Sequence, residues 1–174
     1  MDKKTLRQQI KEKLLRSTVD KRTARSETLC RNLLKLNDIT KASVIAVYME
    51  LYDEISLEYF RKNIAGKTIC IPKVEGEVMN FYPFDGSTIQ GSFDIEEPCS
   101  EKKVDPSKID VMIVPGRAFS LDGSRLGRGR GYYDKYISQP SFHALTIGVC
   151  FSEQISDEIP TEEHDKKMDM LLFA

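Results

Sequence analysis

One stretch of the chain carries residue types that suit the binding of an anion. Residues 125–134 read RLGRGRGYYD, in which three glycines alternate with two arginines and another arginine stands first. Glycine lets the backbone approach a ligand closely, and each guanidinium offers forked N–H donors that match phosphate or carboxylate oxygens. If a helix begins near Gly131, its first N–H groups add to such a site. We therefore predict that the glycine-arginine loop (residues 125–131) binds an anion.

The glycine-arginine loop does not match the standard nucleotide-binding motifs. No G-x-x-x-x-G-K-[ST] run is present, and a G-x-G-x-x-G run fails because its last position falls on Tyr132 or Asp134. A solvated surface loop and an RGG-type RNA segment are the competing interpretations. RGG segments are usually repeated and lie in disordered tails, and a plain turn does not need three arginines at such close spacing. Anion binding is therefore favoured.

Asp134 stands in the first turn of the helix that we expect after the glycine-arginine loop. A carboxylate there is favoured by the helix dipole, and it is equally suited to bind Mg²⁺ beside bound phosphates. Position alone leaves these two interpretations even. Of the adjacent Tyr132 and Tyr133, we expect one ring to pack in the core and the other to line a pocket.

A basic pair lies near the start of the chain. Lys3 and Arg7 are four residues apart on a predicted helix, so they share a face. They stand three residues before the apolar positions Leu6 and Ile10, at the edge of the buried stripe. From there they could reach a phosphate, although a solvated helix face with snorkelling side chains is favoured on sequence alone.

The elements that must position these residues follow from hydrophobic periodicity. We predict helices over residues 2–16, 20–36 and 55–65, and a further helix that begins near Gly131. Residues 85–108 are predicted to be mainly loop, and strands are predicted over residues 43–49, 68–71 (stopped at Pro72), 78–84 (interrupted at Pro83), 109–114, 144–151 and 168–173. This alternation is typical of one three-layer α/β domain over residues 1–174, with a mainly parallel sheet and helices on both faces. Ligands bind such sheets beyond the carboxyl ends of the strands, where the glycine-arginine loop should lie.

Composition narrows the range of partners. A net charge of −1 and a pI of about 6.2 give no overall basic field, so we expect no nucleic acid or anionic lipid as a ligand. No apolar run reaches the roughly 20 residues of a membrane span, and the first residues do not read as a signal peptide. We therefore expect a cytoplasmic protein that does not bind membranes. Four scattered cysteines without a C-x-x-C pair predict no zinc or redox site, and the chain's size predicts a monomer.

Several segments together resemble the 5-formyltetrahydrofolate cyclo-ligase family, also called methenyltetrahydrofolate synthetase. One match would be weak, but their order and spacing agree over nearly the whole chain. The matching segments are K-x-x-L-R at 3–7, D-E-I at 53–55, the run at 93–98, P-G-x-x-F at 115–119, R-L-G-x-G-x-G-Y-Y-D at 125–134, Pro160, H-D at 164–165 and M-D at 168–169. The resemblance implies an enzyme that uses ATP and Mg²⁺ to close 5-formyltetrahydrofolate into 5,10-methenyltetrahydrofolate. It would release ADP and phosphate through an N5-iminium phosphate intermediate.

The resemblance also implies roles for individual residues. Arg128 would neutralise the charge that develops during catalysis, and Asp134 and Asp169 would bind Mg²⁺. The residues expected to contact ATP are Lys3, Lys4, Thr5, Leu6, Arg7, Arg125, Leu126, Gly127, Arg128, Gly129, Arg130, Gly131, Tyr132 and Tyr133. The residues expected to contact the folate are Met49, Glu54, Arg128, Gly129, Arg130, Gly131 and Tyr132.

Two positions depart from the family pattern or vary within it. Ser120 stands where the family usually has Asp, so we assign no role to it. Arg130 stands where relatives carry Lys, Gly or Arg.

Two other classes of function remain open. A sugar-phosphate isomerase or coenzyme A transferase would use the same loop for an anion, and a nucleotide- or phosphopeptide-binding module would bind ATP without forming ADP.

Overall fold

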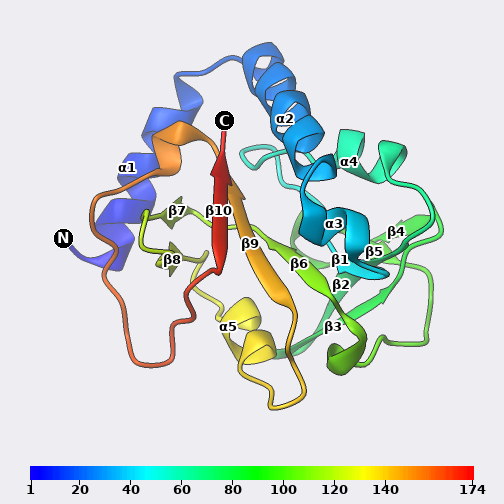
Figure 1. Cartoon of the computed structure of the whole chain (residues 1–174). Helices are drawn as coiled ribbons and strands as arrows, with labels where there is room; N and C mark the ends of the chain where they lie inside the picture. Colours follow the sequence, from blue (N-terminus) through cyan, green and yellow to red (C-terminus); the bar gives the residue numbers. More distant parts are fainter.

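The computed structural model describes residues 1–174 around a six-stranded sheet in the order β10-β9-β6-β1-β2-β3 (Figure 1). All neighbouring strands run parallel except β3, which is antiparallel to β2. The strands are β1 Val44–Ala46, β2 Thr68–Glu75, β3 Val78–Pro83, β6 Val111–Val114, β9 Leu145–Cys150 and β10 Met170–Phe173. The predicted α/β class with a mainly parallel sheet is confirmed.

Five α-helices and several short elements surround this sheet. The helices are α1 Lys3–Leu15, α2 Val19–Leu34, α3 Asn37–Lys41, α4 Glu58–Asn63 and α5 Tyr132–Ile137. Two small antiparallel sheets pair β4 Thr88–Gln90 with β5 Glu96–Pro98, and β7 Ala118–Phe119 with β8 Arg125–Leu126. The 3₁₀ turns are η1 Ser92–Asp94, η2 Pro106–Lys108 and η3 Ser152–Gln154. None of the helices has the length and apolar character that crossing a membrane requires.

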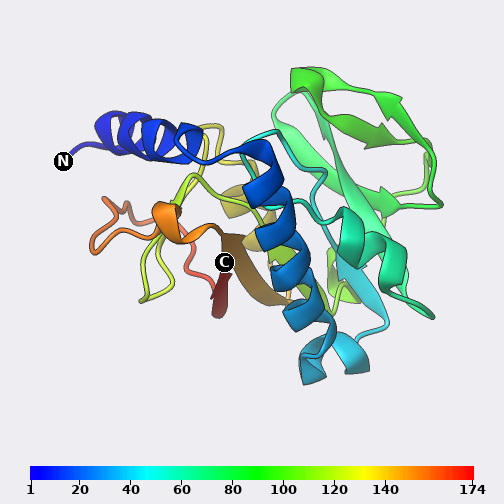
Figure 2. The same cartoon turned by 90° about the horizontal axis from the view of Figure 1, so that it is seen from above.

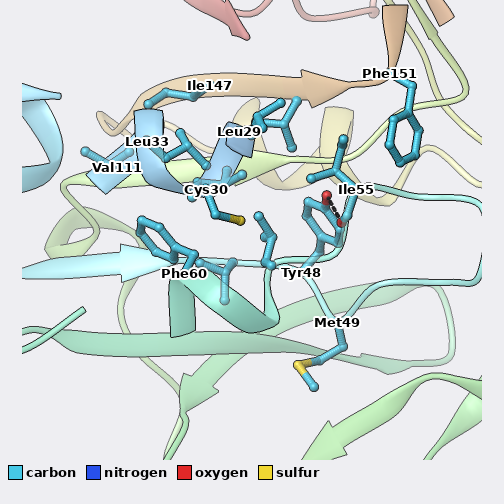
Figure 3. Close-up of a cluster of buried hydrophobic side chains, with 14 of the residues drawn as sticks. Leu29, Cys30, Leu33, Tyr48, Met49, Ile55, Phe60, Val111, Ile147 and Phe151 are labelled. Atoms are coloured by element: carbon cyan, nitrogen blue, oxygen red, sulfur yellow. Dashed lines mark hydrogen bonds between the residues drawn. The ribbon is translucent and has the colours of Figure 1, made fainter. Parts of the chain in front are cut away.

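The strands bury alternate side chains in two separate cores, one on each face of the sheet. On β6, Val111 and Ile113 belong to one core, and Met112 and Val114 belong to the other. The first core also contains the apolar stripes of α1 and α2, and Figure 3 shows Leu29, Cys30 and Leu33 of α2 in this cluster with Val111 and Ile147. The second core contains Tyr136 of α5. Helices therefore cover both faces of the sheet, as predicted.

Strand β2 does not stop at Pro72, contrary to the prediction. It continues to Glu75, and Pro72 pairs with Phe81 of β3. The carbonyl of Ile69 accepts from Phe84 on the β3 side, and the carbonyl of Cys70 accepts from Val47 on the β1 side. By alternation the nitrogen of Pro72 lies on the β1 side, so its missing N–H leaves the β2–β3 pairing intact.

Other segments differ from the prediction in extent, and the helix expected over residues 55–65 forms only over Glu58–Asn63. The strand expected over residues 43–49 pairs only over Val44–Ala46 before the chain turns away from the sheet. The region 85–108, predicted as mainly loop, contains the β4–β5 sheet. Short strands at the periphery have few apolar residues, so periodicity did not reveal them.

The chain adds strands to the sheet in opposite directions from its two central strands, β1 and β6. From β1 the chain adds β2 and β3 on one side, and from β6 it adds β9 and β10 on the other. The connections that leave β1 and β6 therefore diverge and leave a crevice beyond the carboxyl ends of these strands. In Figure 2, α1 lies at one end of the molecule and the β4–β5 sheet at the other.

Candidate active site

A cavity of about 1090 Å³ lies where the connections after β1 and β6 diverge. Met49 and Glu54 reach it from the segment after β1, and Pro115 and Gly116 reach it from the end of β6. Further predicted residues in its wall are Lys3, Arg7, Arg125, Leu126, Gly127, Arg128, Gly129, Arg130, Gly131, Tyr132, Tyr133 and Asp134. The fold thus brings segments from three distant parts of the sequence around one space.

Helix α1 is docked directly on the glycine-arginine loop. The Nε of Arg7 donates to the carbonyl of Gly127 at 2.9 Å, and Figures 1 and 2 both place α1 beside the β7–β8 sheet. The Nζ of Lys3 lies 2.8 Å from Asp165 and 3.3 Å from Glu162. Lys3 and Arg7 therefore face the cavity and not bulk solvent.

The other three residues of the first segment lie outside the cavity wall. Lys4 and Thr5 are exposed on α1, and Leu6 is buried in the core between α1 and the sheet. This division follows from helical spacing, because residues three and four apart share a face while those between them point elsewhere. Within residues 3–7, only the two ends are placed to meet a ligand in this cavity.

Arg125, at the start of the glycine-arginine loop, is a fixed part of the cavity wall. It belongs to β8, and its Nη2 donates to the Oδ2 of Asp134 at 3.0 Å. Its Nη1 donates to the carbonyl of Pro115 at 3.3 Å, and its guanidinium lies 5.6 Å from the centre of the Tyr133 ring. The Nε is buried without a hydrogen-bond partner. This arginine is therefore held on several sides within the wall, and its Nε is closed off from solvent.

Arg128, in the middle of the loop, joins the segment that follows β1. Its Nε donates to the Oε1 of Glu54 at 3.0 Å, and its Nη2 donates to the Oδ1 of Asp53 at 2.6 Å. Burial raises the pKa of the Glu54 carboxyl above its ordinary value, and the charge of Arg128 offsets that rise only in part. Burial alone would also raise the pKa of Asp53, but the hydrogen bonds from Arg117 and Arg128 leave it lowered.

Two glycines of the loop have backbone conformations that other residues rarely adopt. Gly129 has a φ of 106° and Gly131 a φ of 70°, and Gly131 is the N-cap of α5. These positive angles turn the chain sharply from β8 into α5. The alternation of glycine and arginine is therefore required by the backbone as well as by the chemistry.

Tyr132 and Tyr133 are both partly buried against the second core and both border the cavity, so the predicted division into one core ring and one pocket ring is not observed. The hydroxyl of Tyr132 donates to the carbonyl of Gly76 at 3.2 Å near the cavity, while burial raises the pKa of Tyr133. Met49 is nearly buried and borders the cavity next to Tyr48, whose hydroxyl donates to the carbonyl of Ile55 at 2.7 Å (Figure 3). This bond closes the turn that carries Asp53 and Glu54.

The two aspartates expected to share Mg²⁺ line different cavities. Asp134 lies in the wall of the large cavity, and its carboxylate accepts from Arg125 and from the backbone N–H of Lys166 at 3.1 Å. Asp169 lies in a separate depression of about 430 Å³, where its carboxylate accepts from the backbone N–H and the hydroxyl of Thr146 at 2.8 and 2.9 Å. Of these two aspartates, Asp134 alone borders the large cavity.

The cavity wall also contains residues that the sequence did not single out for a role. Phe93 borders it with a φ of 60°, and the guanidinium of Arg130 lies 5.1 Å from the centre of its ring. Arg117 lies outside the wall but holds Asp53. Phe93 begins the run at 93–98 that matches the family pattern, but that match implied no role for it. Arg117 lies within the P-G-x-x-F segment and had no other signal. Ser120 lies in the β7–β8 turn, away from the cavity.

The fold and the cavity define an α/β protein with an arginine-lined cavity at the switch point of its sheet. Comparison with known proteins is more specific. The chain belongs to the 5-formyltetrahydrofolate cyclo-ligase family, whose family model matches residues 1–174. It is therefore an enzyme of that family, and the predicted family and enzyme class are confirmed.

Individual relatives agree with this assignment. The chain is 29% identical to the mouse 5-formyltetrahydrofolate cyclo-ligase, over 98% of this chain and 93% of that protein. It is 31% identical to a probable 5-formyltetrahydrofolate cyclo-ligase of Schizosaccharomyces pombe, over 86% and 83%. The NMR structure of the Aquifex aeolicus 5,10-methenyltetrahydrofolate synthetase has a TM-score of 0.88 at 32% identity, covering 99% of this chain and 90% of that one. A Mycoplasma pneumoniae 5,10-methenyltetrahydrofolate synthetase has the same fold, with a TM-score of 0.80 at 24% identity.

Proposed function

We propose that the chain catalyses the ATP-dependent cyclisation of 5-formyltetrahydrofolate to 5,10-methenyltetrahydrofolate, with release of ADP and phosphate. The observation that carries this proposal is the meeting of Glu54 and Arg128 in one cavity with the basic residues of α1 and the loop. A carboxylate suits the amino and ring N–H groups of a pterin, and clustered cations suit a triphosphate. The cavity therefore contains groups suited to the pterin and groups suited to the triphosphate.

We assign the triphosphate to the basic side of the cavity. Lys3 and Arg7 approach it from α1, and Arg125 adds positive charge to the cavity wall from the loop. The backbone N–H groups around Gly129 and Gly131 add further donors. The folate would lie toward Met49 and Glu54, so that Arg128 stands between the two substrates. Only Lys3 and Arg7 of the first segment would touch ATP directly.

The proposed chemistry activates a poor leaving group. The formyl oxygen attacks the γ-phosphorus of ATP, the bond to ADP breaks, and an N5-iminium phosphate forms. The N10 nitrogen then attacks the activated carbon, loses its proton, and the carbon–oxygen bond breaks to release inorganic phosphate. Such a reaction depends on positioning and charge neutralisation and needs no covalent enzyme nucleophile. Arg128 would neutralise the charge that develops on the transferred group.

Mg²⁺ would neutralise triphosphate charge when it is bound. Asp134 fits such an ion, since it borders the cavity and each of its oxygens keeps a lone pair after its one protein hydrogen bond. Magnesium commonly takes one or two protein carboxylates together with phosphate oxygens. Asp169 would need the segment between Met168 and Met170 to move before it could share that ion. We therefore propose Asp134 as the main protein ligand.

We also infer that residues 1–174 act as one domain and as a monomer.

The experiment that tests the function mixes purified protein with 5-formyltetrahydrofolate, ATP and Mg²⁺. We expect an absorbance rise from methenyltetrahydrofolate with an equal amount of ADP, and we expect both to be lost when Mg²⁺ is omitted. ATP binding without either product would favour a nucleotide-binding module. Product formation that is independent of ATP would contradict the proposed ligase chemistry.

A further inference from the structure

Asp53 is almost completely buried and lies between two arginines. Its side chain is 3% exposed and does not border the cavity. The Oδ2 accepts from the Nη1 of Arg117 at 2.5 Å, and the Oδ1 accepts from the Nη2 of Arg128 at 2.6 Å. A buried carboxylate needs such partners because it has lost its hydration. Each oxygen of Asp53 therefore holds one arginine.

The two arginines differ in how firmly they are anchored. The side chain of Arg117 is 10% exposed, and its backbone N–H donates to the carbonyl of Leu126 at 2.7 Å. The side chain of Arg128 is 35% exposed and makes no ion pair except those to Asp53 and Glu54. Asp53 thus connects a buried arginine with a more exposed one. Through Asp53, the position of the loop arginine depends on the connection that follows β6.

The neighbouring Glu54 holds the same arginine in a different way. Its Oε1 accepts from Arg128, and its Oε2 accepts from the backbone N–H of Leu51 at 2.9 Å. Unlike Asp53, Glu54 borders the cavity. A pterin that donates to Glu54 would compete with Arg128 for the carboxylate. Once that happens, Asp53 is the remaining carboxylate that holds Arg128 in place.

From this arrangement we infer that Asp53 is a positioning residue, which retains Arg128 at the cavity while Glu54 binds the folate. The inference rests on the proposed function, because it takes Arg128 as the catalytic cation and Glu54 as the pterin ligand. Asp53 itself touches no substrate and acts only through Arg128. The ion pairs that link Arg117, Asp53 and Arg128 would therefore affect kcat more strongly than they affect the affinity for folate.

A double-mutant cycle on kcat tests this inference. We expect Asp53→Asn to lower kcat roughly 10- to 100-fold, as expected for a misplaced catalytic group, with the KM for 5-formyltetrahydrofolate within about 2-fold. We expect Arg128→Ala to lower kcat by about 10²–10³. The double variant should be no slower than Arg128→Ala within about 2-fold, because Asp53 then has nothing to position.

Losses that multiply in the double variant would overturn the positioning role and indicate a general structural role. A second variant, Arg117→Gln, releases the anchor of Asp53 without touching Arg128, and we expect a smaller kcat loss that is again absent in the Arg128→Ala background. The control is Glu153→Gln, which removes the carboxylate of the Arg25–Glu153 pair (2.7 Å) outside the cavity. It should leave kcat unchanged in both backgrounds.

The outcomes separate this inference from the proposed function. Normal turnover in Arg128→Ala, or a wild-type protein that forms no methenyltetrahydrofolate, would overturn both. A slow Arg128→Ala variant combined with multiplying losses from Asp53→Asn would overturn the role of Asp53 alone. A rise in the folate KM of Asp53→Asn without a loss of kcat would also contradict it.

Discussion

The beginning and the middle of the glycine-arginine loop are held in different ways. Arg125 has a side chain that is 4% exposed and is fixed by Asp134, by a carbonyl and by an aromatic ring. Arg128 has a side chain that is 35% exposed and is held by two carboxylates, one of which borders the cavity. A rigidly held arginine can form a fixed part of a binding surface. An arginine whose carboxylate partner can be displaced by a substrate can instead change its contacts during a reaction. We therefore expect Arg125 to serve mainly the structure and Arg128 to serve catalysis.

The largest effect expected from this comparison is on the turnover of Arg128→Ala. We expect kcat to fall by about 10²–10³ because the developing charge loses its cation. The free energy of unfolding should change by no more than about 1 kcal/mol, since the side chain is partly exposed. Steady-state kinetics and urea unfolding measure the two quantities. A large loss of stability with normal turnover would reverse the roles assigned to the two arginines.

Arg125→Met is expected to affect stability most strongly. It leaves Asp134 with only the backbone N–H of Lys166 as a partner, so we expect the free energy of unfolding to fall by about 3 kcal/mol. Arg130→Met is the matched control, because Arg130 is exposed and forms no ion pair; its change should lie within about 0.5 kcal/mol. Equal unfolding midpoints for the two variants in urea would show that Arg125 is not the structural arginine.

The pH dependence of folate binding sharpens the role of Arg128 beside Glu54. Burial raises the pKa of Glu54, and the Arg128 charge opposes that rise, so its removal should raise the pKa further. A protonated carboxyl no longer accepts from the pterin at both oxygens. Affinity for 5-formyltetrahydrofolate should therefore fall as the pH drops, and the fall should begin at a higher pH in Arg128→Ala. Calorimetric titrations across the acid range measure this shift, and Glu54→Gln should remove the dependence. If affinity falls at the same pH in Arg128→Ala and in the wild-type protein, Arg128 does not pair with Glu54 in solution.

The smallest effect is expected from Gly131→Ala. Gly131 has a φ of 70° with open space where a Cβ would stand, so the cost is backbone strain of about 1 kcal/mol. Gly66 has the same φ and the same open space, but it does not border the cavity. Gly66→Ala should therefore lower stability equally and leave ATP affinity unchanged, whereas Gly131→Ala should weaken ATP binding. Equal ATP affinity in both variants would contradict a role for the loop backbone in phosphate binding.

The sequence predicted the parts of the site that depend on local patterns. The glycine-arginine loop is recognisable because its residue types are suited to one chemistry, and Lys3 and Arg7 were placed on one face by helical spacing. The sheet was predictable because its central strands, such as Val111–Val114, are apolar on both faces.

Contacts between distant segments were not predictable in the same way. The pairing of Asp53 with Arg117 and with Arg128 depends on how the connections after β1 and β6 fold toward each other. Asp169 looked equivalent to Asp134 in the chain, but its register on the far side of β9 places it beside Thr146. Side-chain type gives the chemistry of a residue, whereas its partner is set by topology.

The most direct measurement follows the formyl oxygen during turnover. The protein is incubated with ATP, Mg²⁺ and 5-formyltetrahydrofolate labelled with ¹⁸O in the formyl group, and the released phosphate is analysed by mass spectrometry. We expect one ¹⁸O atom in each inorganic phosphate, because that oxygen attacks the γ-phosphorus before the ring closes. Unlabelled phosphate, with the ¹⁸O recovered in water, would show that ATP does not activate the formyl group by phosphorylation.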